Sequence, residues 1–438
     1  MTEMKRTVGF FTLGCKVNQY ESEAIGELFE ARGYTVLPSE DVCDVYIINT
    51  CTVTAESDRK ARQIIRRAIT RNPDAFILVT GCLAQTTPES IACIPGVDYV
   101  CGNADKTGIV DAADRLMTTK EKNCMADVRV LPLDGMPFEP MKIQKFDRTR
   151  AYIKIEDGCE SHCTYCIIPA ARGAIRSKPP AEVLAEVKSL TEGGCREIVL
   201  TGIETASYGK DLAGVTLADL LEEVDRIPGI GRIRLGSLDP SLMKPPFVAR
   251  ISRLSSLAPH FHLSMQSGSD AVLRRMKRKY NSTMALENIQ ELRRVIPNLM
   301  LTTDMIVGFP GETEEDFEQT MEFARQAEFL MIHVFPYSGR RGTPAVSMSG
   351  QISSAVKHER ALRLSNLEAE IRRRILEKEI AGQTVTDVLF ETYENGYACG
   401  HTANFIEVRV KSDRNRRSEL CPVRFLETDG NTITAELL

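Results

Sequence analysis

The sequence lacks any apolar run close to the roughly 20 residues that a membrane-spanning helix requires. It also lacks an excess of positive charge, because 55 lysines and arginines against 60 aspartates and glutamates give a net charge of −5. A uniformly basic coat for nucleic acid is therefore excluded, whereas a local basic patch is not. Its first residues show no apolar segment followed by a small-residue cleavage site. We therefore expect a cytoplasmic protein that does not contact a membrane.

The composition is that of an ordinary globular protein. The 438 residues are 43% hydrophobic and 26% charged, and the length favours about three domains. Thirteen cysteines stand out against this background. Because their number is odd and no secretion signal is evident, they indicate metal ligation or catalysis rather than a disulfide framework.

The hydrophobic pattern divides the chain into an α/β region, a second α/β region and a β-rich tail. Strand-like and helix-like runs alternate over residues 7–117, which predicts a parallel sheet covered by helices. Residues 118–148 have no clear period and are expected to be irregular. Alternation then resumes over about six units, which favours a partial (β/α) barrel. A charged helix is predicted near 353–379, followed by a small all-β barrel. The expected domains are 1–120, a linker 121–147, 148–376 and 377–438.

Three cysteines lie on one short loop directly after the first strand of the predicted barrel. In GCESHCTYCIIP they are Cys159, Cys163 and Cys166. Active sites of such barrels lie at the carboxyl ends of the strands, so this loop is well placed. Three thiolates can bind three irons of a four-iron–four-sulfur cluster and leave the fourth iron open. Zinc is the alternative, with His162 as fourth ligand, although structural zinc usually has two separated ligand pairs.

Three further cysteines each follow a predicted strand of the first region. Cys15 follows 8–14, Cys51 follows 44–50 and Cys82 follows 75–81. Because neighbouring parallel strands end at the same edge of a sheet, these cysteines are expected to converge. Buried free cysteines without a common role are the alternative.

Basic residues gather in three places. The run VRVKSDRNRR (408–417) has five basic residues and one acid, and RRMKRKY (274–280) has five basic residues beside Tyr280. Such runs favour contact with phosphate, although a solvated face is the simpler reading. Arg172 and Arg176 follow the three-cysteine loop and are candidates for substrate contact. The RNA-contact candidates in the tail are Arg409, Lys411, Arg414, Arg416 and Arg417.

Several motifs together resemble the methylthiotransferase family of radical S-adenosylmethionine (radical SAM) enzymes. They are TLGCKVNQYESEAI, NTCTVT, TGCLAQ, GCESHCTYCIIP with Arg172-Gly173, HLSMQSGSD, DMIVGFPGET and VFPYSGRRGTPA, in this order over essentially the whole chain. The resemblance implies an N-terminal methylthiotransferase domain, a radical SAM core and a C-terminal TRAM domain.

The same resemblance implies the cofactors and the residues that hold them. Cys159, Cys163 and Cys166 would bind the [4Fe-4S] cluster that cleaves S-adenosylmethionine (SAM), and Cys15, Cys51 and Cys82 would bind a second, auxiliary [4Fe-4S] cluster. Tyr165 stands where the loop meets the adenine of SAM. Further SAM contacts would come from strand ends, where a turn or cap role is equally open: Gly202, Glu204, Ser237, Asp239 and Gln266. Thr313 in GFPGET reads as the N-cap of a helix.

The residues after Cys15 point to one branch of the family. Lys16-Val17-Asn18 resembles the branch that adds a methylthio group to carbon 2 of N6-threonylcarbamoyladenosine at position 37 of tRNA. The isopentenyladenosine branch typically has Gln-Met-Asn there, and the branch acting on a ribosomal-protein aspartate has Pro or Ala followed by Lys-Asn. The implied partners are a tRNA anticodon stem-loop, a flavodoxin- or ferredoxin-like reductant and a sulfur source. A non-catalytic, metal-containing RNA-binding protein is the alternative from a different class.

Overall fold

The computed structural model describes residues 6–122, 125–146 and 149–438, and its first unit is a parallel sheet between two layers of helices. The strand order is β2-β1-β3-β4-β5-β6, and every pair is parallel. The strands are β1 (Thr7–Thr12), β2 (Thr35–Leu37), β3 (Val45–Thr50), β4 (Phe76–Gly81), β5 (Tyr99–Cys101) and β6 (Asp127–Arg129). The helices are α1 (Lys16–Ala31), α2 (Ala55–Arg71), α3 (Cys82–Thr86), α4 (Pro88–Ala92) and α5 (Ile109–Thr119). The predicted helix-covered parallel sheet is confirmed.

The two faces of this sheet have separate apolar cores. α1 and α5 cover one face, and α2, α3 and α4 cover the other. Every residue of β3 and β4 is buried, as expected for central strands of a parallel sheet. β6 lies in the stretch that was expected to be irregular. Its three residues are all exposed, so no hydrophobic period marks it in the sequence.

The second unit is an open barrel of six parallel strands. They form two sheets, β7-β10-β11 and β12-β13-β14, which isolated bridges at Ile233–Leu257 and Leu238–Leu263 join. The strands are β7 (Ala151–Lys154), β10 (Glu197–Thr201), β11 (Arg232–Leu235), β12 (His260–Gln266), β13 (Met300–Val307) and β14 (Met331–Pro336). Among the described strands β14 does not pair with β7, so the barrel is partial, as predicted.

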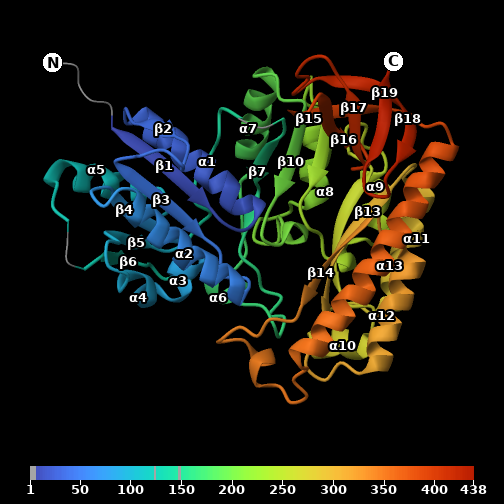
Figure 1. Cartoon of the computed structure of the whole chain (residues 1–438), viewed down its shortest axis with the longest axis horizontal. Coiled ribbons are helices and arrows are strands. Elements are labelled where there is room, and N and C mark those ends of the chain that lie inside the picture. Colours follow the sequence, from blue (N-terminus) through green and yellow to red (C-terminus); the bar gives the residue numbers. More distant parts are fainter. Residues whose placement is uncertain (1–5, 123–124, 147–148) are drawn as a thin grey trace.

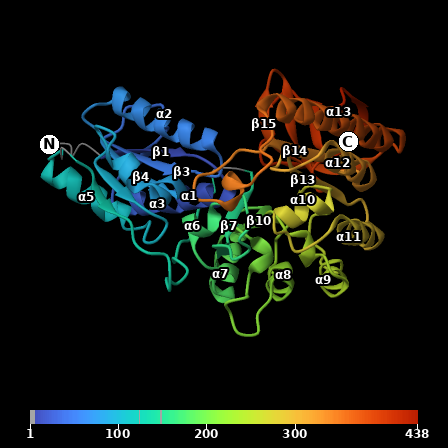
Figure 2. The same ribbon diagram turned by 90° about the horizontal axis from the view of Figure 1, so that it is seen from below.

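Helices follow the barrel strands and cover their outer side (Figure 2). They are α6 (Ile168–Arg172), α7 (Pro180–Glu192), α8 (Leu217–Asp225), α9 (Pro245–Ile251), α10 (Asp270–Arg275), α11 (Ser282–Val295) and α12 (Glu314–Ala327). Thr313 caps α12, because its hydroxyl accepts from the Asp316 amide while the Asp316 carboxylate accepts from the Thr313 amide. Two short strands, β8 (Glu156–Asp157) and β9 (Arg176–Ser177), pair antiparallel. They flank the segment that contains the three-cysteine loop.

The chain ends in a long helix and a closed five-stranded barrel. α13 (Ser354–Ala381) packs against β14 and crosses residues 376 and 377, where the sequence analysis separated the last two domains. The barrel order is β15-β16-β17-β19-β18, which confirms the predicted small β-barrel. The strands are β15 (Val385–Glu394), β16 (Tyr397–Thr402), β17 (Glu407–Lys411), β18 (Leu420–Thr428) and β19 (Ile433–Leu437). Among the described helices, none combines the length and apolar character needed to cross a lipid bilayer.

A buried group of charges joins the first unit to the open barrel. α1 lies between the parallel sheet and β7 (Figure 1) and carries Glu21, which is fully buried. The Glu21 carboxylate accepts hydrogen bonds from Arg172 (2.6 Å), from Lys154 (2.8 Å) and from Lys106. Burial by itself would raise the pKa of Glu21, but these three cations hold it well below its ordinary value. Since Lys154 and Arg172 belong to the barrel unit, one carboxylate fixes the position of the two units.

Replacing Glu21 by alanine would leave Lys106 without a carboxylate partner among the described residues, and Asp157 alone would have to pair with both Lys154 and Arg172. We expect the free energy of unfolding to fall by about 3–5 kcal/mol. The matched control is Glu56→Ala, which removes a carboxylate from an ion pair on the exposed side of α2 and should leave the melting temperature nearly unchanged. Thermal and urea unfolding followed by circular dichroism compare the two. A loss in Glu21→Ala no larger than that in the control would show that the buried charges do not hold the units together.

Candidate functional site

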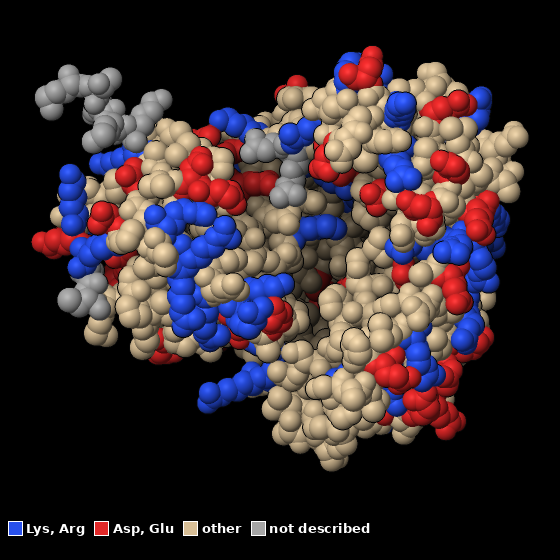
Figure 3. Space-filling model, viewed as in Figure 1, with Lys and Arg blue, Asp and Glu red and all other residues tan. Residues whose placement is uncertain are grey.

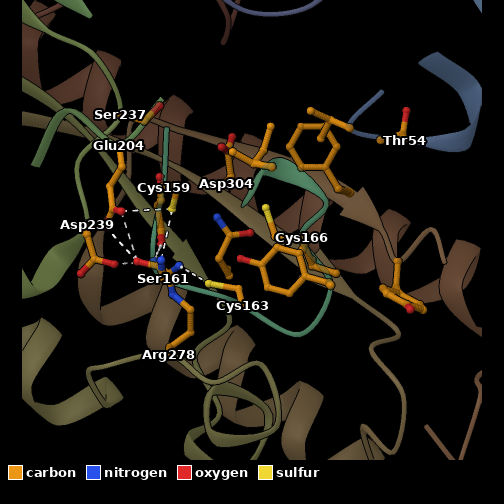
Figure 4. A pocket seen from close by; sticks show the side chains of 18 of the residues that line it. Thr54, Cys159, Ser161, Cys163, Cys166, Glu204, Ser237, Asp239, Arg278 and Asp304 are labelled. Atoms are coloured by element: carbon orange, nitrogen blue, oxygen red, sulfur yellow. Dashed lines mark hydrogen bonds and ion pairs between the residues drawn. The ribbon is translucent and has the colours of Figure 1, made fainter. Parts of the chain in front are cut away.

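A cavity of about 330 Å³ lies at the carboxyl ends of the barrel strands, and three cysteines line it together (Figure 4). Cys159, Cys163 and Cys166 reach it from the loop that follows β7 and β8. Nη1 of Arg278 donates to Sγ of Cys163 at 3.3 Å. Sγ of Cys159 lies 3.1 Å from Oε2 of Glu204, and burial, followed by the charge of Glu204, raises the pKa of Cys159. We call these three cysteines the loop trio.

The other three cysteines converge at the edge of the parallel sheet. β1, β3 and β4 are neighbours in the sheet, and Cys15, Cys51 and Cys82 follow their carboxyl ends. Nδ2 of Asn18 donates to the carbonyls of Leu13 and Thr50, at 2.7 and 3.1 Å, and so holds two of the three strand ends together. Burial, reinforced by the charges of the other two thiols, raises the pKa of Cys51 to about 11. We call these residues the sheet-edge trio.

Neither trio forms a compact site for a single metal ion among the described residues, because in neither do the three sulfur atoms all lie within 4.8 Å of one another. Three thiolates can each bind a different iron of a four-iron cluster. His162 is exposed and does not line the cavity, so it gives no support to a zinc site.

The sheet edge that carries the second trio reaches the cavity of the loop trio through the residues after Cys51, although Cys15, Cys51 and Cys82 are not among the lining residues. Val53 and Thr54 follow Cys51 directly in the chain and line the same cavity as the loop trio, with Thr54 across the cavity from Cys159 in Figure 4. Nη2 of Arg340, from the segment after β14, donates to the hydroxyl of Thr52 (2.5 Å) and pairs with Asp58 (2.9 Å). The sheet edge is thus fastened to the rim of the barrel.

Five of the six residues predicted to contact SAM line this cavity. They come from the loop that carries the trio and from the ends of three successive strands, β10, β11 and β12: Tyr165, Glu204, Ser237, Asp239 and Gln266. Gly202 does not line it and packs behind it. A Cβ at this position would lie 2.5 Å from Oε2 of Glu156, so only glycine allows β10 to end so close to β8.

Arg278 and Asp304 line this cavity as well, although neither was among the candidate site residues. Arg278 is the more informative case. It belongs to the run 274–280, which was expected to form a basic patch with Tyr280. Instead its guanidinium pairs with Asp239 at 2.8 Å and donates to the Ser264 carbonyl at 3.0 Å, while Tyr280 is buried. Arg275 of the same run pairs with Asp316. The expected patch is therefore wrong for these residues, because their acidic partners lie far away in the sequence.

Arg172 and Arg176 also differ from expectation. Arg172 is fully buried, so direct contact with substrate is ruled out in this structure. Its guanidinium instead donates to Sγ of Cys82 at 3.3 Å and to Oδ1 of Asn18 at 2.5 Å. Arg176 is largely buried and pairs with Asp157 at 3.4 Å. Arg172 thereby links the segment after the loop trio to a sulfur of the sheet-edge trio.

The basic residues of the tail lie on and after β17 in the closed barrel. Lys411, Arg414 and Arg417 are exposed. Arg414 and Arg416 both pair with Glu419, and Arg409 lies 3.5 Å from Asp429. The local positive charge is therefore smaller than the run 408–417 suggested, because acids outside the run pair with it.

Comparison with known proteins gives two family matches. Residues 153–324 match the model of the Radical SAM superfamily, and residues 7–102 match "Uncharacterized protein family UPF0004". The chain is 42% identical over 432 residues to Threonylcarbamoyladenosine tRNA methylthiotransferase MtaB of Bacillus subtilis, which covers 96% of this chain and 94% of that protein. It is 37% identical to tRNA-2-methylthio-N(6)-dimethylallyladenosine synthase of Moorella thermoacetica, over 85% of this chain and 84% of that protein.

Among solved structures, the fold is similar to that of TsrM from Kitasatospora setae, a radical SAM methyltransferase. The TM-score is 0.54 at 16% identity, over 78% of this chain and 75% of the other. At this identity the likeness concerns the fold alone. It agrees with an open barrel that carries the loop trio at the carboxyl ends of its strands.

Gly81, directly before Cys82, lies where the ends of β3 and β4 pack closely together. Its φ is +96°, and a Cβ there would lie 2.4 Å from the backbone oxygen of Thr50. Gly81→Ala must therefore displace the strand ends that carry Cys51 and Cys82. We expect iron content after anaerobic reconstitution to fall by about half, from about eight to about four irons per chain.

The matched control for this substitution is Gly33→Ala. Gly33 has a similar φ of +84°, but a Cβ there meets nothing within 4 Å. The control should lose about 1–2 kcal/mol from backbone strain and keep its iron. Equal iron content in the two variants would contradict a tightly built sheet-edge trio.

Proposed function

Since this chain belongs to the tRNA methylthiotransferases of the radical SAM superfamily, we propose that it adds a methylthio group to carbon 2 of N6-threonylcarbamoyladenosine at position 37 of tRNA. The observation that carries the proposal is a cavity lined by the loop trio and also by Val53 and Thr54, which follow Cys51 of the sheet-edge trio. Lys16-Val17-Asn18 and the relative from Bacillus subtilis favour this substrate over isopentenyladenosine or a ribosomal-protein aspartate. A purely structural metal is disfavoured because the loop trio opens into a cavity.

Enzymes of this family use SAM and two [4Fe-4S] clusters. In our proposal the loop trio and the sheet-edge trio each hold one cluster. Together these cofactors supply the one-electron chemistry that an unactivated aromatic C–H bond requires, and the sulfur and methyl group that replace its hydrogen. The work of the chain is to hold, orient and enclose them.

The cavity has both polar and apolar lining residues, which suit different parts of the reactants. Near Cys159 and Cys163 the lining is polar: Glu204, Asp239 and Arg278 offer two carboxylates and a guanidinium to the amino and carboxylate groups of SAM. The lining also contains apolar side chains, among them Val53, Ile306 and Phe335. Apolar walls exclude water from reactive species, and flat or branched side chains suit a purine base.

The substrate RNA would approach over basic surfaces beside the cavity. Figure 3 shows lysine and arginine side chains gathered on the lobe formed by the parallel sheet, next to the central hollow of the molecule. α2, which begins after Cys51, presents Lys60, Arg66 and Arg67 to solvent. With the exposed Lys411 and Arg414 of the closed barrel, proposed to act as a TRAM domain, they would contact phosphates of an anticodon stem-loop.

The remaining partners follow from the chemistry. One-electron reduction needs a donor, for which we propose a flavodoxin- or ferredoxin-like protein, and repeated turnover needs a sulfur source. Six thiolates in two clusters also favour a reducing compartment, so we propose the cytoplasm.

Removing one cysteine from each trio separates their roles. Cys166→Ala should abolish reductive cleavage of SAM, whereas Cys82→Ala should keep SAM cleavage and lose methylthio transfer, each with about four irons instead of about eight. Cys43→Ala removes a buried cysteine two residues before β3 and serves as the control, with iron and both activities retained. Iron analysis and chromatography of 5′-deoxyadenosine measure these outcomes. Loss of SAM cleavage in Cys82→Ala would contradict the assignment.

The substrate is tested by nucleoside analysis of tRNA. Mass spectrometry of tRNA from a strain that lacks the gene should show N6-threonylcarbamoyladenosine without its methylthio derivative, and expression of this chain should restore the derivative. The matched comparison is 2-methylthio-isopentenyladenosine in the same RNA, which should not change. Loss of that nucleoside instead would assign the chain to the other branch.

A further inference from the structure

Polar side chains from two neighbouring pairs of barrel strands meet at the floor of the cavity. His262 on β12 is level with Thr302 on β13, and Asp304 on β13 is level with His333 on β14. Nε2 of His262 lies 3.2 Å from Oδ2 of Asp304, and the rings of His262 and His333 are 5.9 Å apart. Asp304 also lines the cavity of the loop trio. This group therefore lies where a molecule in the cavity can touch it.

Lys16 faces the same region from the other unit. It is the first residue of α1 and directly follows Cys15, so it lies at the sheet-edge trio. Its side chain is exposed, and among the described residues it has no hydrogen bond or ion pair. Its electrostatic neighbours include Arg150, Arg234 and Asp304, and it also acts on His333. Lys16 therefore lies at the sheet-edge trio and near the cavity residue Asp304, and no described side chain forms an ion pair with it.

The other cations near Lys16 are already paired. Arg150, Arg232 and Arg234 all lie within 3.5 Å of Glu197, which is fully buried, and Arg150 also pairs with Glu391. Asp304 is held by His262. Among these four cations, Lys16 is the one that no described carboxylate binds in an ion pair.

The charge of Lys16 favours an anion over a metal ion at the floor. His262, Asp304 and His333 bring their ligand atoms within 4.8 Å of one another and in isolation would suit a divalent cation. A cation there would be repelled by Lys16, whose charge acts on His333. A carboxylate would instead be attracted to Lys16.

We propose that Lys16 binds the carboxylate of the threonylcarbamoyl group of the substrate and so selects this adenosine over isopentenyladenosine. The inference rests on the proposed function. The threonylcarbamoyl group has one carboxylate, a hydroxyl and urea N–H groups, whereas an isopentenyl group has no polar atom. Asp304 is an acceptor for the hydroxyl or an N–H, and His333 completes the polar wall.

The position of Lys16 agrees with the chemistry of the base. Carbon 2 and carbon 6, which carries N6, both flank N1 of the purine, so a substituent on N6 lies near the carbon that reacts. A residue that touches this substituent must therefore lie beside the reacting groups. Lys16 meets this requirement because it follows a cysteine of the sheet-edge trio and approaches the cavity residue Asp304.

The experiment compares an anticodon stem-loop that carries N6-threonylcarbamoyladenosine with the same stem-loop as its methyl ester. The ester keeps the shape and removes the charge. For the wild-type enzyme we expect kcat/KM and binding affinity to fall about tenfold or more with the ester. Lys16→Gln should lose a similar factor with the carboxylate, mainly in KM, and should no longer distinguish it from the ester. Lys16→Arg should restore most of the preference.

Iron content and SAM cleavage without RNA report whether the variants remain intact. Lys188→Gln removes an exposed lysine of α7 and is the control, with no change in either substrate. Equal affinity of the wild-type protein for carboxylate and ester would overturn the inference without any variant. An undiminished preference in Lys16→Gln would overturn it too. A wild-type enzyme that acts only on isopentenyladenosine would instead refute the proposed function.

Discussion

The arrangement of both cysteine trios depends on how Arg172 and Glu21 meet in the interior. Glu21 belongs to the helix that begins after Cys15, and Arg172 belongs to the helix that follows Cys166. Their contact of 2.6 Å is fully buried, and the same guanidinium reaches Cys82. Buried charges are costly unless each finds its partners in a fixed geometry. This cluster therefore permits essentially one placement of the parallel sheet on the open barrel.

That placement brings the sheet edge with its cysteines next to the cavity of the loop trio. A lone barrel with the loop trio would hold SAM at one end of an open space. The parallel sheet closes this space with the strand end that carries Cys51, Val53 and Thr54. In our proposal the substrate base enters between the two groups of thiolates, and its N6 substituent lies near Lys16 and Asp304.

Much of this could be predicted from the sequence, because the informative features are local. The cysteine spacing, the alternation of strands and helices and the Thr313 cap each depend on a few neighbouring residues, and the structure has all of them. The position of Cys15, Cys51 and Cys82 at three strand ends is a consequence of parallel topology. Lys16-Val17-Asn18, directly after Cys15, indicated the threonylcarbamoyladenosine branch of the family from the sequence alone.

The errors concern residues whose partners are distant in the sequence. Three arginines look like surface residues when only their sequence neighbours are considered. In the fold each pairs with a distant acid: Arg172 with Glu21, Arg275 with Asp316 and Arg278 with Asp239. Gly202 stands beside Glu204 in the sequence, yet it is glycine because β8 packs against it. Lys16 differs from these arginines, because no described side chain pairs with it. Its proposed role depends instead on a bound substrate.

The central claim is that the two trios hold clusters that face one another across one cavity. Electron paramagnetic resonance of the reconstituted, fully reduced protein tests it most directly, because two nearby paramagnetic clusters broaden and split each other's signals. We predict a spectrum with this mutual interaction that differs from the sum of the spectra of two variants, each lacking one cluster. A spectrum equal to that sum would show that the clusters lie too far apart to share a substrate, and it would contradict the account.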